Sequence, residues 1–268
     1  MRTLLNIIIP ILLLTSCSND DEIENEYSNN LLDSDVQYLL FNDDIRFTDN
    51  NFTFSQLDSI VFNYQNQNIT KVIGGFEIYD PFSSYLNKRL TNDIYDSIIK
   101  LNDTYKVYTH PETAPYYFTD NPENPVEYII SNNQIQKAIR RDGLVLNYYY
   151  GDNLILEKND ENLLLRKFYL ENNNLIKVEK FKYDLNFEIN DKTEILFQEY
   201  DSSPNPFKGK HYLLGAFYRS FSENNYSNYV INAYDRLDDG TFQLYYTLEV
   251  STPFGYNDDN YPLFGNYE

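Results

Sequence analysis

Few residues of this chain belong to the types that carry out acid–base or metal chemistry. Its two histidines, His110 and His211, stand far apart, and there is no pair of cysteines to join them as ligands. A zinc site needs clustered imidazole and thiolate ligands, and the His-Glu-x-x-His motif is absent. The Gly-x-Ser-x-Gly turn and the phosphate-binding glycine loop are absent as well. We therefore predict no catalytic residue, no metal site and no cofactor.

Carboxylates are the abundant reactive groups, with 41 Asp and Glu residues in the chain. A glycosidase needs two of them on either side of the scissile bond, and that pairing is spatial, so a surface glycan-degrading enzyme stays open as an alternative. Asp238-Asp239-Gly240 and the Asn-Asp-Asp-Asn run at 257–260 offer oxygens to calcium. Neither follows the alternating ligands and distal Glu of an EF-hand, so we interpret both as turns.

Tyrosine is the residue type best suited to binding, because its ring stacks on a ligand while its hydroxyl hydrogen-bonds. The pairs and runs of Tyr place rings on both faces of a strand. We predict a ligand-binding surface that includes Tyr116, Tyr117, Tyr148 and Tyr150. The alternative is that these rings form the core on one face and ordinary strand cover on the other.

Cys17 is the only cysteine of the chain. It follows Arg2, an apolar run at 4–14 and the small residues Thr15-Ser16. A basic start, a short apolar core and small residues at the end make up a secretory signal. The apolar run is shorter than the roughly 20 residues that a spanning helix needs. We expect export and no second thiol for a disulfide within the chain.

The segment Leu14-Thr15-Ser16-Cys17 resembles the lipobox of bacterial lipoproteins. The resemblance implies cleavage before Cys17, which would carry a thioether-linked diacylglycerol and an N-acyl chain. Asp20-Asp21-Glu22 then resemble the surface-export signal of Bacteroidota lipoproteins, which implies an outer-membrane protein exposed at the cell surface. An ordinary signal peptide with an incidental cysteine is the alternative.

The domain organisation follows from this beginning. We predict that residues 1–16 are a signal peptide. Residues 17–32 are expected to be the cysteine that the resemblance implies is lipidated, followed by an acidic, flexible tether that cannot bury enough apolar surface to fold. Residues 33–268 form a single β-rich domain with a loop or helix excursion around 80–125. Phe and Tyr favour strands, and about 250 residues suffice for one large domain.

The charge of the chain restricts its partners. The formal net charge is −20, and removal of residues 1–16 with Arg2 makes it −21. Such a chain repels phosphate backbones, so we expect no nucleic-acid partner. Anionic headgroups are equally unattractive, which leaves the N-terminal lipid as the means of contact with a membrane.

A repeated pattern indicates the architecture. Segments beginning at Phe62, Tyr128, Tyr148 and Phe168 share an aromatic strand start, a polar Asn or Gly turn and an aliphatic continuation, the last three at a period of about 20 residues. Asn and Gly tolerate the positive φ of tight hairpins. We predict a mainly β fold, an antiparallel meander of repeated β-hairpins with a few short helices or covering loops. The style is similar to YD-type repeats, without their Tyr-Asp-x-x-Gly core.

Two later motifs carry a second resemblance. Tyr200-Asp201, with Asn205-Pro206-Phe207, and Phe221-Ser222-Glu223-Asn224-Asn225 look like the motifs of a group of uncharacterised Bacteroidota surface lipoproteins, for residues 125–268. That resemblance implies no activity. We predict structural turns: an Asx-turn at Asp201, strand termination by Pro206, and a left-handed turn at Asn224-Asn225. The segment between the motifs is interpreted as a crossover linking two parts of the sheet, with a short helix or a covering segment at 212–217.

The remaining segments complete the expectation. Residues 80–120 should interrupt the meander, with a helix at 93–101 and a functional loop at 111–125. Residues 235–240 should form a hairpin turn into a final strand at 241–250. The leading hypothesis is a non-catalytic, lipid-anchored surface protein that binds a glycan, a peptide or an outer-membrane protein, or serves in adhesion. An accessory subunit of an outer-membrane uptake system is a further alternative.

Overall fold

The structure is a computed structural model, and it describes residues 61–65, 68–80, 87–111, 124–213, 216–251, 255–256, 258, 260 and 262–263. The predicted signal peptide, Cys17, the predicted acidic tether, Tyr116 and Tyr117 lie outside the described residues. Within them, thirteen strands form one antiparallel sheet in which every strand pairs with its neighbours in sequence order. Its strands are β1 (Val61–Gln65), β2 (Asn68–Asp80), β3 (Asn87–Leu101), β4 (Thr104–Pro111), β5 (Val126–Ser131), β6 (Gln134–Ile139), β7 (Val145–Tyr150), β8 (Leu154–Asn159), β9 (Leu164–Glu171), β10 (Asn174–Tyr183), β11 (Ile189–Tyr200), β12 (Tyr226–Arg236) and β13 (Phe242–Ser251). A separate pair, β14 (Gly255–Tyr256) and β15 (Pro262–Leu263), follows.

The predicted mainly β meander is confirmed, as are the hairpins β1–β2, β5–β6, β7–β8 and β9–β10. The turns of two of these hairpins, β5–β6 and β9–β10, use asparagine for its tolerance of positive φ: Asn132 and Asn133 have φ of 53° and 61°, and Asn172 and Asn173 have 50° and 62°. The matching values show that the two hairpins repeat in backbone conformation as well as in sequence.

The predicted interruption at 80–120 is wrong where the structure describes it, because β3 and β4 continue the meander across 87–111. The helix predicted at 93–101 is a strand. Ile94 and Ile98 fit one face of a helix and also one face of a strand, and Asp96 between them shares the buried face. A buried carboxylate at that position hid the strand alternation.

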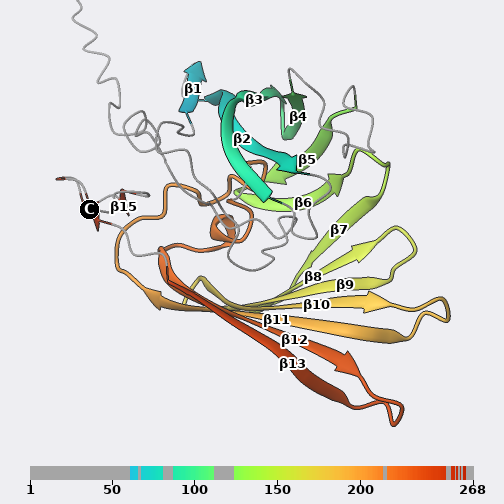
Figure 1. The fold of residues 1–268 in the computed structure, drawn as a ribbon. Helices are drawn as coiled ribbons and strands as arrows, with labels where there is room; N and C mark the ends of the chain where they lie inside the picture. Colours follow the sequence, from blue (N-terminus) through green and yellow to red (C-terminus); the bar gives the residue numbers. More distant parts are fainter. Residues whose placement is uncertain are drawn as a thin grey trace, which may run out of the picture.

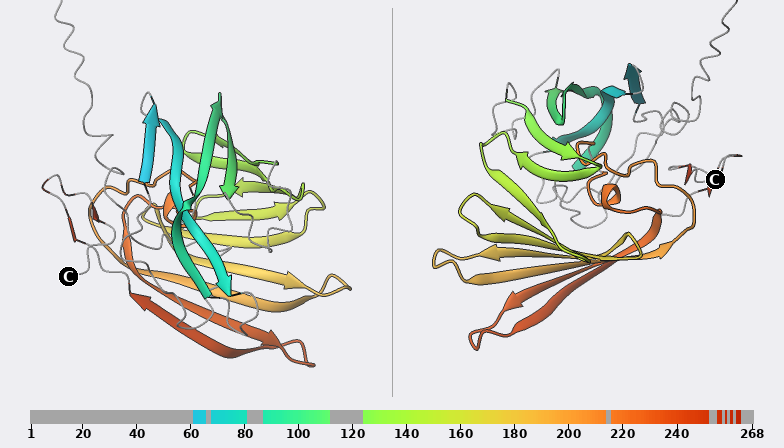
Figure 2. Two further views of the ribbon diagram at one scale, coloured as in Figure 1. Left: turned by 45° about the horizontal axis from the view of Figure 1, so that its top comes forward. Right: turned by 180° about the vertical axis from the view of Figure 1, so that it is seen from behind.

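The sheet curves around one long connection, whose described residues are 201–213 and 216–225 and which we call the covering segment. In Figure 1 it runs as an orange trace on the inner side of the curved sheet, and the rear view in Figure 2 shows the same arrangement. It contains η1 (Arg219–Phe221), a single 3-10 turn, and α-helices are absent among the described residues. The predicted crossover is wrong: the covering segment leaves β11 and returns to the adjacent β12.

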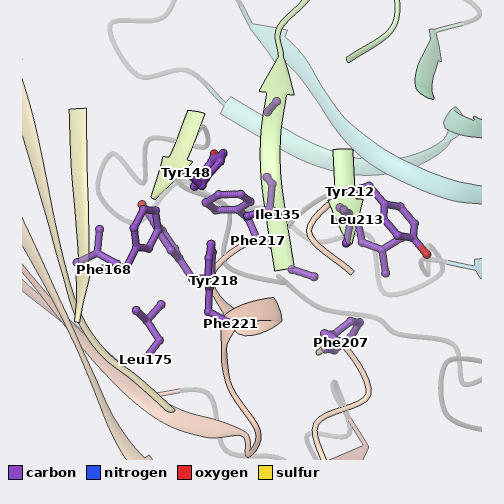
Figure 3. Packing of buried hydrophobic residues seen from close by; sticks show 14 of the residues in the cluster. Ile135, Tyr148, Phe168, Leu175, Phe207, Tyr212, Leu213, Phe217, Tyr218 and Phe221 are labelled. Carbon is purple, nitrogen blue, oxygen red and sulfur yellow. The ribbon is translucent and has the colours of Figure 1, made fainter. Parts of the chain in front are cut away.

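The covering segment seals the inner face of the sheet. Phe168, Leu175 and Val178 on β9 and β10 are fully buried beneath it. Phe168 stacks on Phe221 with ring centroids 4.7 Å apart and meets Phe217 edge-on at 6.2 Å. Figure 3 shows these rings converging from the sheet and from the covering segment. Aromatic pairs of this kind add to the stabilisation from burial itself.

The turns of the hairpins hold the covering segment in place. A Cβ on Gly209, whose φ is +73°, would lie 2.7 Å from Cβ of Asn133, so only glycine fits at this contact. At the β9–β10 turn, the amide of Glu223 donates to the carbonyl of Asn173 at 3.0 Å, and the amide of Asn224 donates to Oδ1 of Asn174 at 2.9 Å. The repeated Asn turns are therefore docking points as well as chain reversals.

Candidate functional site

The motif residues in the covering segment form a hydrogen-bond network. Oδ1 of Asp201 accepts from the amides of Ser203 at 3.1 Å, an Asx-turn, and of Asn225 at 2.9 Å. Nδ2 of Asn205 donates to the carbonyls of Arg219 at 2.7 Å and Ser222 at 2.9 Å. These side chains replace the backbone pairing that an irregular buried segment lacks.

The other motif residues complete this network. Nδ2 of Asn224 donates to the carbonyl of Ser203 at 3.0 Å, and Pro206 lies buried beside Asn205. The left-handed turn predicted at Asn224-Asn225 is wrong, because positive φ occurs at other asparagines and not at these two. Their amide side chains make the turn without that conformation.

A serine–histidine pair lies inside the same segment. Oγ of Ser220 is 2.5 Å from Nδ1 of His211, and Nε2 of His211 is 3.3 Å from the carbonyl of Asn133. Burial lowers the pKa of His211 to about 3, against the backbone hydrogen bond to Asn133, which raises it. Ser220 is 1 % exposed, so a substrate cannot reach it. The buried, neutral imidazole of His211 instead connects the covering segment to the β5–β6 turn.

Tyr148 and Tyr150 do not form an exposed ladder. Tyr148 is buried at 5 % exposure, and its hydroxyl donates to Oε2 of Glu157 at 2.7 Å. The hydroxyl of Tyr150, half-buried, donates to the carbonyl of Ile135 at 3.0 Å. Both rings belong to the inner face, as the alternative interpretation stated, and Tyr149 between them is the exposed ring. Positions 148 and 150 share a face because side chains alternate along a strand.

Two carboxylates are buried among the described residues, Asp96 and Glu157, and each has protein partners. Oε1 of Glu157 accepts from Nε of Arg166 at 2.7 Å, in addition to the Tyr148 hydroxyl. Oδ1 of Asp96 accepts from Oγ1 of Thr109 at 2.5 Å. Burial raises the pKa of Asp96, although the hydrogen bond from Thr109 and the charge of Arg141 oppose it. Both carboxylates make structural contacts on the inner face.

The outer face of β9–β12 carries a different arrangement. We call it the outer array; its six members are Tyr169, Lys177, Glu179, Lys192, Glu194 and Tyr234. The neighbours of Tyr169 and Glu179 along their strands, Phe168 and Val178, point into the core, so the array points away from it. Sequence reasoning missed these residues, and their one signal is the repeated Lys-x-Glu at 177–179 and 192–194.

The outer array consists of two equivalent units. In the first, the hydroxyl of Tyr169 donates to Oε2 of Glu179 at 2.6 Å, and Nζ of Lys177 donates to Oε1 at 3.0 Å. The same Nζ lies 4.2 Å from the ring centroid of Tyr169. Each group of the unit therefore contacts both of the others, which fixes the ring and its hydroxyl.

The second unit repeats these contacts. The hydroxyl of Tyr234 donates to Oε2 of Glu194 at 2.7 Å, and Nζ of Lys192 donates to Oε1 at 2.9 Å and lies 4.5 Å from the Tyr234 ring centroid. Glu179 and Glu194 are directly opposite each other across β10 and β11. The local two-fold axis of that antiparallel pair relates the two units.

The pKa values of the two carboxylates are shifted in the same direction. Burial works to raise the pKa of Glu179, but the hydrogen bonds from Tyr169 and Lys177 outweigh it and lower that pKa. Glu194 likewise has a lowered pKa, because Lys192 and Tyr234 outweigh its burial. A glycosidase acid needs a raised pKa beside an ionised partner. Two facing carboxylates that are both ionised do not supply that division of roles.

The pKa values of the two tyrosines are raised, whereas those of the two carboxylates are lowered. Burial and the hydrogen bond to Glu179 raise the pKa of Tyr169 to about 12, and the hydrogen bond to Glu194 with burial raises that of Tyr234 to about 12. Both hydroxyls are therefore protonated at neutral pH. With two lysines against two glutamates, the outer array is locally neutral on a chain of net charge −20.

Clusters of three or more His, Cys, Asp or Glu that could hold a metal ion are absent from the described part of the chain. Within the same residues, no helix is long and apolar enough to cross a membrane.

Comparisons with known proteins were made with both sequence and fold. No family model matches the chain, and no curated protein matches its sequence. Among solved structures, a porin-like protein from Bacteroides vulgatus is similar with a TM-score of 0.39 and 12% identity, covering 72% of this chain and 89% of that one. A porin-like protein from Bacteroides uniformis has a TM-score of 0.36 and 9% identity, covering 72% and 88%. Neither likeness says what this chain does.

Proposed function

We propose that this chain is a lipid-anchored outer-membrane protein, exposed at the cell surface, that binds an extended carbohydrate without catalysis. The outer array is the observation that carries the binding proposal. Its two Tyr–Glu–Lys units present fixed hydroxyl, carboxylate and ammonium groups along one face of the sheet. A ligand rich in hydroxyl groups can both donate to and accept from such a surface.

Preorganisation supports this assignment. A side chain that is already ordered loses little conformational entropy when a ligand binds, which favours affinity. Tyr169 and Tyr234 are held at both the ring and the hydroxyl. The local neutrality of the outer array also lets a glycan, including one with acidic sugars, approach a chain that is otherwise strongly anionic.

Binding is tested with an array of neutral and uronic-acid polysaccharides. The double variant Tyr169→Ala/Tyr234→Ala should lose about tenfold or more in affinity for any polysaccharide that the unsubstituted chain binds. Tyr149→Ala is the matched control, since Tyr149 is an exposed strand tyrosine on β7 outside the array. Equal affinity of the unsubstituted chain, the double variant and the control would contradict the proposal. Thermal unfolding shows whether each of the three proteins is folded. Binding to extended peptides instead of glycans would assign the face to a different ligand.

The anchor is tested separately. Cys17→Ala should release the protein from membranes into the soluble fraction, because several acyl chains supply the membrane affinity. Cys17→Ser serves as a second variant with the same loss of the thiol. Membrane retention of both variants would refute the lipid anchor, and protease accessibility on intact cells tests exposure at the surface.

A further inference from the structure

Strand β13 is an edge of the main sheet. Among the described residues it pairs with β12 alone, and the sheet order ends there. It is ten residues long, against five for β1 at the opposite edge. Its side away from β12, to which no described strand is paired, presents a row of backbone N–H and C=O groups that can template another strand.

This edge lacks most of the devices that protect natural edges. Such edges carry lysine, proline or inward-pointing charge. The sequence of β13 is Phe-Gln-Leu-Tyr-Tyr-Thr-Leu-Glu-Val-Ser, with one charged residue, Glu249. Leu244 is 48 % exposed and Tyr245 is 63 % exposed. The one irregularity is a bulge opposite Ala233/Tyr234, which leaves Tyr246–Ser251 in regular pairing with β12.

The regular part of β13 is complementary to itself. Antiparallel pairing about a two-fold axis at Leu248 sets Leu248 against its own copy, Tyr246 against Val250 and Thr247 against Glu249. Each pair then joins residues on one face, since opposite residues share a face in a sheet. Apolar residues meet apolar ones on the inner side, and the carboxylate of Glu249 meets a hydroxyl.

Charge favours the antiparallel arrangement over the parallel one. In-register parallel pairing would place the two Glu249 carboxylates side by side, which is destabilising. The antiparallel pairing separates their Cα atoms by roughly 8 Å, from about 3.4 Å per residue along the strand and about 4.8 Å across it. It also puts the two acidic turns at Asp238-Asp239 at opposite ends of the interface.

We propose that β13 pairs with the β13 strand of a second copy, antiparallel about Leu248, so that the sheet continues across a two-fold axis. Such an interface is isologous, because the same surface serves on both partners. The proposal is independent of the ligand assigned to the outer array and of the lipid anchor.

Disulfide trapping in the full-length chain tests the arrangement. In a Cys17→Ser background, which has no other thiol, Leu248→Cys should give a reductant-sensitive dimer under mild oxidation. Glu249→Cys is the matched control and should stay monomeric, because Cα atoms more than about 7 Å apart cannot be bridged without backbone movement. Cross-linking at both positions, or at neither, overturns the proposal.

Sedimentation gives a second measurement, which does not depend on a substitution on the inner face. The Cys17→Ser chain should sediment as a dimer, and adding Thr247→Glu should make it monomeric, because each new carboxylate would lie directly opposite Glu249 of the other copy, and like charges opposite each other destabilise a strand pair. Gln136→Glu, at an exposed strand position on β6, is the control and should leave the dimer intact. A monomeric Cys17→Ser chain, or a dimer that survives Thr247→Glu, overturns the proposal.

Discussion

The two faces of β9–β12 use the same residue types for opposite purposes. On the inner face, the hydroxyl of Tyr200 donates to the backbone carbonyl of Leu175 at 2.5 Å. On the outer face, the hydroxyls of Tyr169 and Tyr234 donate to carboxylates that also accept from a lysine. A buried hydroxyl needs any acceptor to avoid an unsatisfied polar group. An outer hydroxyl already has water available, so its contact with a charged partner selects an orientation.

This difference between the faces predicts where substitutions should lower the free energy of unfolding most. Inner-face residues are sealed beneath the covering segment and should dominate stability, whereas outer-array residues should affect binding more than folding. Surface ion pairs contribute between roughly 0 and 1 kcal/mol each. The following variants test this difference between the two faces, in descending order of expected effect.

Phe168→Ala should have the largest effect on the free energy of unfolding. The ring is fully buried and stacks on Phe221, so its removal should cost about 3–5 kcal/mol in lost burial and cavity formation. Tyr169→Ala, the next residue on the outer face, should cost distinctly less. Urea unfolding of the two variants measures the contrast directly, and equal losses would contradict the division between the faces.

Glu157→Gln should follow, because it leaves Arg166 without its ionised partner on the inner face. Removal of one member of a buried ion pair costs about 3–5 kcal/mol, and partial exposure of Arg166 at 12% puts our expectation at the lower end. The double variant Glu157→Leu/Arg166→Met should recover part of that loss, because it removes both charges. Glu179→Gln provides the outer-face comparison, and a loss as large as that of Glu157→Gln would break the contrast.

His211 should make the seal sensitive to acid. Its pKa is about 3 in the folded protein and about 6.5 when unfolded, so below pH 6.5 the unfolded state binds more protons. Stability is therefore complete above that pH and falls as the pH drops toward 3. Between pH 6.5 and 4.5 the loss should exceed that of His211→Gln by roughly 2 kcal/mol. Parallel denaturation curves for the two proteins, in which the carboxylate contributions cancel, would show that His211 is not the sensor.

Phe187→Gly should have the smallest effect and the opposite sign. Phe187 lies in the β10–β11 turn with φ of 62°, a conformation that a bulky residue adopts at a cost, and its side chain is 68 % exposed. Glycine removes that strain and loses little burial, so the melting temperature should rise modestly, by an amount equivalent to about 0.5–1 kcal/mol. A fall in melting temperature would show that the exposed ring makes a stabilising contact.

The fold was predictable from the sequence where the information is local. The hairpins at 128–138 and 168–178 follow from Asn turns between alternating strands, and the turn at 235–240 leads into β13 as expected. The strand β3 was not predictable, because Asp96 is tolerated in the core only through Thr109 on the next strand and Arg141 in a later turn. Those partners are invisible to a local pattern.

The candidate site was less predictable for a related reason. The run Tyr148-Tyr149-Tyr150 does not reveal which ring faces outward, and the structure places the outer one at Tyr149. The outer array joins residues from four strands between Tyr169 and Tyr234, so its symmetry appears only once the register of β10 and β11 is known. Spacing alone showed two Lys-x-Glu pairs and nothing of their tyrosines.

The docking of the covering segment onto the hairpin turns has a consequence for the order of folding. Each hairpin joins residues close in sequence, whereas His211 reaches a carbonyl 78 residues earlier and Asn224 reaches Asn174 across 50 residues. Contacts between distant residues form slowly, because loop closure costs entropy before the contact compensates for it. The asparagine turns must also exist before anything can dock on them. The chain should therefore build its strands in sequence and close its core last, with β9–β10 exposed to solvent until the covering segment docks.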